Sequence, residues 1–422
     1  MKIEEITPSS FNKLTQYFQN FIEIEETGSI LFAAYHKGKL AYCNKFGLRD
    51  REEKIPIEFD DIFRFYSMTK PIVCLAALTL YEDGKFNLDD PIENFLPEFK
   101  NMKVLKSYDQ KTDGFELIDT KNRITIKHLF THTSGLSYGF YPGVPIDKLY
   151  GKEFGYVEDN RAKEVIEAIP KMEILEKFSR RLSTLPLFFE PGTRWWYGYN
   201  HEILGLLIEK LSGKKLDVFL REQIFDKLGM NDTDFYVPEE KRKRLAKPYM
   251  KKLDEVLIEV KGPISEGFNS KPKFLSGGGG LLSTLEDYLK FCIMMMNGGE
   301  WNGIRIVSSK TIEMMTSNQF SDRKTTLDMQ YYEIEDPEIR KHNEGYGFGL
   351  GVIVKIADNM TRGGIGEYGW GGAADTVFKI DPSKQTITIM LSQHIPPDNN
   401  WIHPIPQDNI KISKLVYDAL GI

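Results

Sequence analysis

One apolar segment restricts how this chain can fold more than any other part of it. Between Pro71 and Tyr81 almost every residue is apolar, and Asp83 and Gly84 follow as a helix stop. A helix that is apolar on all sides must be covered on all sides, so we expect it at the centre of the molecule. The 422 residues exceed the roughly 250 to 300 at which one hydrophobic core usually stops growing, which favours two lobes.

Strand patterns occur near both ends of the sequence. Runs of β-branched and aromatic residues at 30–35 and 39–43 flank a short turn, and similar runs at 376–380 and 386–391 flank another. We expect each pair of runs to form a hairpin of one antiparallel sheet. That sheet would be assembled from distant parts of the chain.

Helical patterns lie at both ends and in the middle. Amphipathic spacing predicts a helix over 11–22, ended by Gly28, and another over 410–420. We therefore predict an α+β fold with two lobes. The expected boundaries are 1–84 and 256–422 for a sheet lobe flanked by the terminal helices, and 85–255 for an inserted, mostly helical lobe.

The charge and cysteine content argue against several classes of partner. The formal net charge is −6 and the basic residues are scattered apart from short runs such as 241–244, so we expect no nucleic-acid partner. Residues 1–28 lack the unbroken apolar stretch of a secretion signal, and no window approaches the ~18 apolar residues of a membrane span. Cys43, Cys74 and Cys292 suit reduced thiols better than a disulfide framework. We expect a soluble cytoplasmic protein with no membrane partner.

Ser67 and Lys70 open the apolar helix with the spacing S-x-x-K. Three residues apart, the hydroxyl and the amine lie on the same helical face. Pro71 is tolerated in the first turn, where N–H groups have no intrahelical partner to lose, so we expect the helix to start at or just before Ser67. The helix N-terminus favours a developing oxyanion, and burial disfavours the charged form of a lysine, which lets it act as a base. These are the requirements of a nucleophilic serine, although S-x-x-K alone is a weak signal.

Four further stretches strengthen the S-x-x-K signal, because all five match one superfamily in the correct order. They are residues 62–71, 129–136, 191–197, 277–281 and 368–372. The chain resembles the class C β-lactamase and DD-peptidase superfamily over nearly its whole length, and it is most similar to the branch called family VIII carboxylesterases. The resemblance implies the β-lactamase/penicillin-binding-protein fold, with the active site between the two lobes.

The resemblance also implies the roles of particular residues. Ser67 would be the nucleophile and Lys70 its partner, while Tyr197 would exchange protons with the nucleophile and the leaving group. Whether Lys70 or Tyr197 is the initial base stays open. The oxyanion hole would consist of the backbone N–H groups of Ser67 and Ala373. Tyr66 is expected to contact the substrate.

The chain departs from the lactamases at their third motif, Lys-Thr-Gly. The aligned residues here are Trp370, Gly371 and Gly372, which we expect to contact the substrate. The exchange removes a charge that helps to hold the lactam carboxylate and adds an apolar wall, so neutral esters become the expected substrates. The second motif differs too, since Tyr-x-Asn has become Tyr-x-x-Asn, and we assign no catalytic role to Asn200.

Two other patterns favour structural roles. His128 and His132 lie four apart, but no acidic residue sits where a zinc protease needs one. The glycine run 277–280 lacks the Lys-Ser or Lys-Thr of a phosphate-binding loop and indicates close backbone packing near the site. We expect neither a metal nor an organic cofactor.

The function that these residues favour is hydrolysis of carboxylic esters through an acyl-enzyme on Ser67. Two alternatives use the same chemistry: a β-lactamase or D-amino-acid peptidase, and an acyltransferase in which an alcohol or amine replaces water. A penicillin-binding or scaffold module without catalysis is the alternative from another class, and the joint presence of Ser67, Lys70 and Tyr197 argues against it. The expected partner is a small-molecule ester or amide. The physiological substrate and the oligomeric state lie beyond the sequence.

Overall fold

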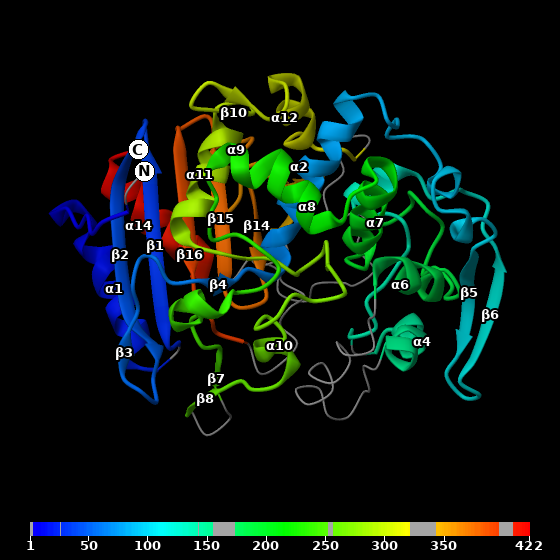
Figure 1. The fold of residues 1–422 in the computed structure, drawn as a ribbon, viewed down its shortest axis with the longest axis horizontal. Coiled ribbons are helices and arrows are strands. Elements are labelled where there is room, and N and C mark those ends of the chain that lie inside the picture. The colour runs from blue at the N-terminus through cyan, green and yellow to red at the C-terminus, as the bar shows by residue number, and fades with distance from the viewer. Residues whose placement is uncertain are drawn as a thin grey trace.

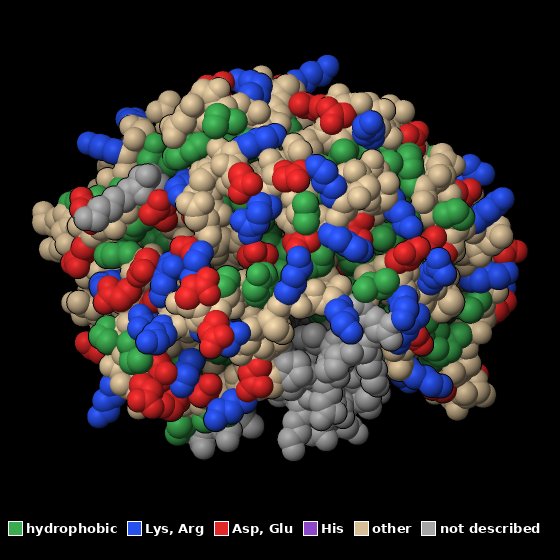
Figure 2. Space-filling view, in the orientation of Figure 1, with side chains coloured by type: hydrophobic (Ala, Val, Ile, Leu, Met, Phe, Trp, Pro, Cys, Tyr) green, Lys and Arg blue, Asp and Glu red, His purple; other side chains and the backbone are tan. Residues whose placement is uncertain are grey.

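The protein is described here from a computed structural model. The structure describes residues 3–25, 27–141, 143–154, 174–251, 256–320, 343–395 and 408–422. None of the helices in these ranges is both long and apolar enough to span a membrane. Figure 2 shows Lys and Arg side chains interspersed with Asp and Glu over the face that it presents.

The largest element of the fold is an eight-stranded antiparallel sheet (Figure 1). Its strands, in spatial order, are β12 (Tyr346–Phe348), β13 (Ile353–Lys355), β14 (Tyr368–Gly372), β15 (Thr376–Asp381), β16 (Thr386–Leu391), β1 (Ser29–His36), β2 (Lys39–Asp50) and β3 (Ile55–Pro56). Strand β1 pairs with β16, so that Ala33 lies opposite Ile389. The prediction that both ends of the chain build one sheet is confirmed.

The terminal helices pack on one face of this sheet. Helices α1 (Asn12–Glu23) and α14 (Asp408–Leu420) lie side by side and bury an apolar cluster against β1 and β2. The ring of Phe18 in α1, for example, packs against that of Phe32 with 5.1 Å between the centroids and a tilt of 42°. Helix α1 ends at Glu23, before the Gly28 that we expected to end it. Gly28 instead lies against Tyr249, where an added Cβ would come within 2.9 Å of the ring.

The apolar helix lies on the opposite face of the sheet, and its burial confirms what its sequence predicts. Helix α2 (Thr69–Glu82) is buried along nearly its whole length and packs against α7 (Asn200–Ser212). Helix α11 (Leu285–Met296) packs beside it on β15 and β16. The α-helix begins at Thr69, later than expected, because a single 3-10 turn over Tyr66–Met68 precedes it.

Shorter elements complete the fold, and Figure 1 shows several of them well away from the sheet. The helices are α3 (Ile126–Phe130), α4 (Pro145–Phe154), α6 (Leu175–Leu182), α8 (Leu216–Leu220), α9 (Asp226–Leu228), α10 (Pro263–Glu266) and α12 (Ser309–Met315). The two-stranded ribbons are β4 (Phe63–Arg64) with β9 (Leu282–Ser283), β5 (Lys103–Asp109) with β6 (Gly114–Asp119), β7 (Tyr249–Lys251) with β8 (Leu257–Glu259), and β10 (Glu300–Trp301) with β11 (Ile304–Arg305).

A buried carboxylate holds the loop that precedes α4. Asp147 accepts hydrogen bonds from the backbone N–H groups of Gly139 at 3.1 Å and Tyr141 at 2.8 Å, and from the hydroxyl of Ser137. Burial is the largest influence on this group and raises its pKa to about 6, against the lowering effect of the hydrogen bonds. The folded protein therefore binds a proton at Asp147 more tightly than the unfolded chain does.

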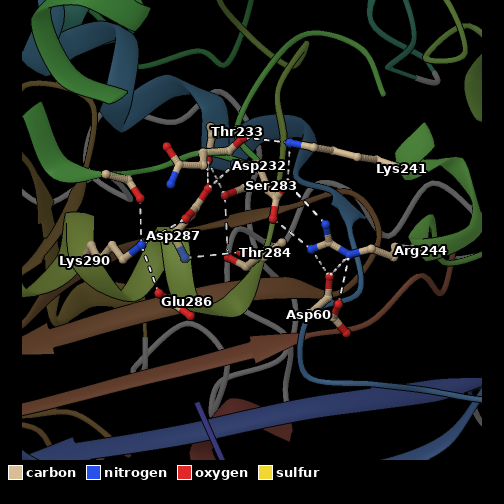
Figure 3. A network of polar contacts seen from close by, with 12 residues as sticks. Asp60, Asp232, Thr233, Lys241, Arg244, Ser283, Thr284, Glu286, Asp287 and Lys290 are labelled. Carbon is tan, nitrogen blue, oxygen red and sulfur yellow. Dashed lines mark hydrogen bonds and ion pairs between the residues drawn. The ribbon is translucent and has the colours of Figure 1, made fainter. Parts of the chain in front are cut away.

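A network of polar side chains joins the start of α11 to two loops (Figure 3). Thr284 caps the helix by accepting the N–H of Asp287. The Asp287 carboxylate accepts the N–H of Asp232 at 2.7 Å and the hydroxyl of Thr233 at 3.1 Å. Asp232 also forms an ion pair with Arg244 at 2.8 Å. Because Asp287 is buried, its partners depend on it rather than on water.

The raised pKa of Asp147 predicts a pH-dependent contribution to stability. A folded-state pKa above the unfolded value of 3.8 means that this contribution grows as the pH falls through 6. The free energy of unfolding of the wild type, relative to Asp147→Asn, should rise by about 2 kcal/mol between about pH 7.5 and about pH 4.5. Urea unfolding of both proteins at the two pH values measures this difference, and a difference that stays constant would contradict the assignment.

The network around Asp287 predicts a large loss of stability on its removal. Asp287→Ala leaves the partly buried N–H of Asp232 without its acceptor, which should cost about 2 to 4 kcal/mol in the free energy of unfolding. Glu286→Ala is the matched control, since the neighbouring Glu286 is more exposed and forms an i,i+4 ion pair with Lys290 (Figure 3), and it should cost less than about 1 kcal/mol. Equal losses in the two variants, measured by urea unfolding, would show that the Asp287 contacts carry no special weight.

Candidate active site

Ser67 and Lys70 meet at the start of the buried helix. Ser67 lies in the 3-10 turn directly after β4 and is partly exposed, whereas the Lys70 residue is only 1% exposed. The Lys70 Nζ atom donates to the Ser67 Oγ atom at 3.0 Å and to the carbonyl oxygen of Gly278 at 2.5 Å. The structure thus brings together the pair that the S-x-x-K spacing predicts. The amine is within reach of the serine proton.

Tyr66 precedes the serine in an uncommon conformation. Its φ angle is +42°, in the left-handed region that a residue with a side chain rarely adopts. Its ring packs edge-on to Phe268, with 6.2 Å between centroids, and against the apolar residues Val260, Ala374 and Ile395. Burial raises the pKa of its hydroxyl to about 12. Tyr66 therefore shapes the turn that presents Ser67.

Tyr197 lies beside the lysine with its ring rather than with its hydroxyl. The Lys70 Nζ atom is 4.5 Å from the centroid of the Tyr197 ring, a distance at which the cation and the ring attract each other. The Tyr197 hydroxyl is buried and has no hydrogen-bond partner among the described residues. This hydroxyl is available to an incoming group.

Ala373 follows β14, which passes close to the turn that carries Ser67. An added Cβ at Gly372 would lie 2.3 Å from the carbonyl oxygen of Phe65, so only glycine permits this approach. Thr376, which pairs with Gly372 across the β14–β15 hairpin, donates to the same carbonyl at 3.5 Å. The backbone of β14 is therefore anchored beside the serine turn, one residue before Ala373.

Trp370 forms an apolar wall on β14. It is buried, and its ring lies 5.6 Å from that of Tyr197 and 5.4 Å from that of Phe348, measured between centroids. The structure therefore places an aromatic group directly beside Tyr197. Gly371 and Gly372 continue the same strand and are only partly buried.

The glycine run 277–280 packs closely against α7 and its surroundings, which confirms the packing role predicted for it. An added Cβ would lie 2.3 Å from the carbonyl oxygen of His201 at Gly277, and 2.2 Å from the Glu202 Oε1 atom at Gly278. At Gly280 it would lie 2.7 Å from the ring of Phe235. This close approach places the Gly278 carbonyl oxygen within reach of Lys70.

One buried carboxylate behind the lysine escaped sequence analysis. Glu202 is 3% exposed; its Oε1 atom accepts from Ser276 at 3.0 Å, while its Oε2 atom has no partner among the described residues. Burial raises the pKa of Glu202, and the positive charge of Lys70 opposes this rise. The carboxyl group thus lies directly behind the Gly278 peptide, whose carbonyl oxygen accepts from Lys70. Glu202 lies only five residues after Tyr197 in the sequence, and this nearness to a candidate site residue could have drawn attention to it.

The histidines considered as metal ligands have separate structural contacts. His128 accepts the N–H of Thr125 through its Nδ1 atom at 3.1 Å, as part of the cap of α3. The Nδ1 atom of His132 lies 2.9 Å from the side-chain Nδ2 atom of Asn200, and the Oδ1 atom of Asn200 accepts from the Ser134 hydroxyl at 2.5 Å. Asn200 thus holds the loop beneath the site, and burial lowers the pKa of both histidines.

The assembled residues provide the parts required for acyl transfer. A partly exposed hydroxyl is paired with a buried amine, the Tyr197 hydroxyl has no hydrogen-bond partner among the described residues, and Trp370 lines the β14 side with an aromatic group. These residues come from the segments expected for both lobes. Such a site suits attack on a neutral carbonyl compound.

Comparison with known proteins agrees with this chemistry. The family model described as Beta-lactamase matches residues 14–403. The ML-236A carboxylate methylbutanoyltransferase of Penicillium citrinum is 27% identical over 96% of this chain and 93% of the relative. Esterase EstB of Burkholderia gladioli is 28% identical over 86% of this chain and 85% of the relative.

A similar fold is also found among solved structures. Unliganded simvastatin synthase (LovD) from Aspergillus terreus superposes with a TM-score of 0.77 at 22% identity, covering 98% of each chain. This likeness extends over both the sheet and the helices that surround it. The resemblance inferred from the motifs is therefore confirmed, and the chain belongs to the Beta-lactamase family, as a serine hydrolase enzyme with the β-lactamase and penicillin-binding-protein fold.

Proposed function

We propose that this enzyme hydrolyses carboxylic esters through an acyl-enzyme on Ser67. The observation that carries the proposal is the 3.0 Å hydrogen bond between the buried Lys70 Nζ atom and the Ser67 Oγ atom. A lysine held in this way can, in its neutral form, accept the serine proton as the hydroxyl attacks the ester carbonyl. The similarity to an esterase over most of both chains supports the same chemistry.

The other site residues act at later points of the same reaction. The N–H groups of Ser67 and Ala373 stabilise the oxyanion that forms on the carbonyl oxygen. Tyr197 gives its proton to the departing alkoxide and regains the proton that Lys70 took from Ser67. Its ring lies beside Lys70, and its hydroxyl has no hydrogen-bond partner among the described residues. Water then attacks the acyl-enzyme, and the acid is released as Ser67 regains its proton.

Neutral esters are the proposed substrate class because of Trp370. Its indole, packed on Tyr197, replaces the cation that holds the carboxylate of a lactam. Desolvating an anionic substrate against an aromatic wall without a countercharge is unfavourable, whereas a neutral acyl or alkoxy group gains apolar contact there.

Acyl transfer to an alcohol is the second candidate function. It is favoured by the likeness to a methylbutanoyltransferase over nearly the whole of both chains. The first half of the reaction is identical, and only the group that attacks the acyl-enzyme differs. Product analysis with an added alcohol acceptor separates the two functions.

A burst assay with a short-chain p-nitrophenyl ester tests the nucleophile. Wild type should release one p-nitrophenolate per chain in the burst and gain one acyl group by intact-mass measurement, because we expect hydrolysis of the acyl-enzyme to be slower than its formation. Ser67→Ala should lose the label and at least about a thousandfold in kcat/KM. Ser10→Ala, at an exposed serine, is the control and should match the wild type. A labelled Ser67→Ala protein would exclude Ser67 as the nucleophile.

A comparison of substrates tests the role of Trp370. The wild-type kcat/KM should be higher for a short-chain p-nitrophenyl ester than for nitrocefin by about a hundredfold or more, which is the effect of an unpaired anion worth about 3 kcal/mol. Steady-state kinetics of both substrates on one preparation gives the ratio. A nitrocefin efficiency above that for the ester would favour the lactamase alternative.

A further inference from the structure

Residue Gln393, just beyond β16, is tied to the strand that leads into the serine turn. Gln393 is 2% exposed, and its side chain binds both the N–H and the carbonyl group of Arg64. The Gln393 Oε1 atom accepts the Arg64 N–H at 3.1 Å, and the Nε2 atom donates to the Arg64 carbonyl at 3.1 Å. Arg64 lies three residues before Ser67. The contact therefore fixes the approach of the chain to the first proposed oxyanion donor.

The next residue, His394, is tied to the turn that follows the second proposed donor. Its Nδ1 atom lies 2.8 Å from the Oδ2 atom of Asp375, two residues after Ala373. Asp375 has a φ of +53°, a conformation that a non-glycine residue keeps only where its surroundings stabilise it. The His394 Nε2 atom is buried without a hydrogen-bond partner among the described residues. The polar contact of the imidazole is therefore the one between its Nδ1 atom and Asp375.

The segment that carries both side chains is itself held in place. Tyr249 of β7 donates its N–H to the carbonyl of Gln393 at 2.7 Å and accepts the N–H of Ile395 at 2.7 Å. The guanidinium of Arg64 is buried and donates to the carbonyl oxygen of Ala246 at 2.7 Å. Two consecutive residues on a fixed backbone thus contact both strand β4, which leads to Ser67, and the turn that follows Ala373.

We infer that Gln393 and His394 form a brace that sets the spacing between the N–H groups of Ser67 and Ala373, and that both are positioning residues for the acyl-transfer step. The inference rests on the proposed function, because the two N–H groups matter as a pair only if an oxyanion forms between them. Hydrogen bonds to an oxyanion are effective only over a narrow range near 2.7 to 3.1 Å. A small shift of one loop therefore lowers the stabilisation of the transition state more than it lowers substrate binding.

Asp375→Gly is the most informative variant. Glycine adopts the positive φ without strain, so the turn keeps its shape while the contact with His394 is lost. We expect kcat for a short-chain p-nitrophenyl ester to fall about tenfold to a hundredfold, KM to change less than about threefold, and Tm to stay within a few degrees. Asp375→Asn retains an acceptor oxygen for the imidazole and should stay within about threefold of wild type.

Two further variants keep the test falsifiable. His394→Ala should lower kcat as Asp375→Gly does, and the double variant should be no worse than either single one, because both remove the same contact. His36→Ala is the matched control: its Nδ1 atom contacts Thr386 at 3.1 Å across the other end of the β1–β16 pair. It should leave kcat unchanged.

The outcomes separate the brace from the proposed function. A wild type that forms the acyl-enzyme, with wild-type kcat in both Asp375→Gly and His394→Ala, would overturn the brace alone. Losses that multiply in the double variant, or losses confined to KM, would also overturn it. A wild type that gains no acyl group in the intact-mass measurement would overturn the proposed function, and the brace with it.

Discussion

The burial of the Lys70 amine is the constraint on which the rest of the structure depends. A polar nitrogen removed from water must find partners within the protein, and here these are the Ser67 hydroxyl, the Gly278 carbonyl and the face of the Tyr197 ring. Each partner comes from a different part of the chain. The packing that satisfies the amine is therefore the same packing that assembles the site.

Two glycines make this assembly possible because they have no Cβ atom. Gly278 lets the buried Glu202 side chain lie against the peptide whose carbonyl oxygen accepts from Lys70. Gly372 lets strand β14 lie against the backbone just before the serine turn. A single Cβ at either place would push apart groups that must act within hydrogen-bond distance. Backbone proximity, as much as side-chain chemistry, defines this site.

Local patterns revealed the elements, but not how distant parts of the chain meet. Alternation and periodicity predicted the hairpins and the buried helix, and a spacing of three predicted the contact between Ser67 and Lys70. The 3-10 turn before α2 escaped notice because it depends on the positive φ of Tyr66, which tertiary packing maintains. Sequence patterns also missed Glu202 and His394, because their contacts with Ser276 and Asp375, which lie 74 and 19 residues away, follow no local periodicity. The division into two lobes stays a prediction.

The pairing of β1 with β16 has a consequence for how the molecule forms. Residues about 350 positions apart are neighbours in the central sheet, as His36 and Thr386 illustrate. Such high contact order slows folding and leaves unpaired strand edges exposed in the meantime. During synthesis the first hairpin leaves the ribosome long before its neighbouring strand exists. The nascent chain must remain competent to fold, and free of aggregation, until the residues of β16 have been made.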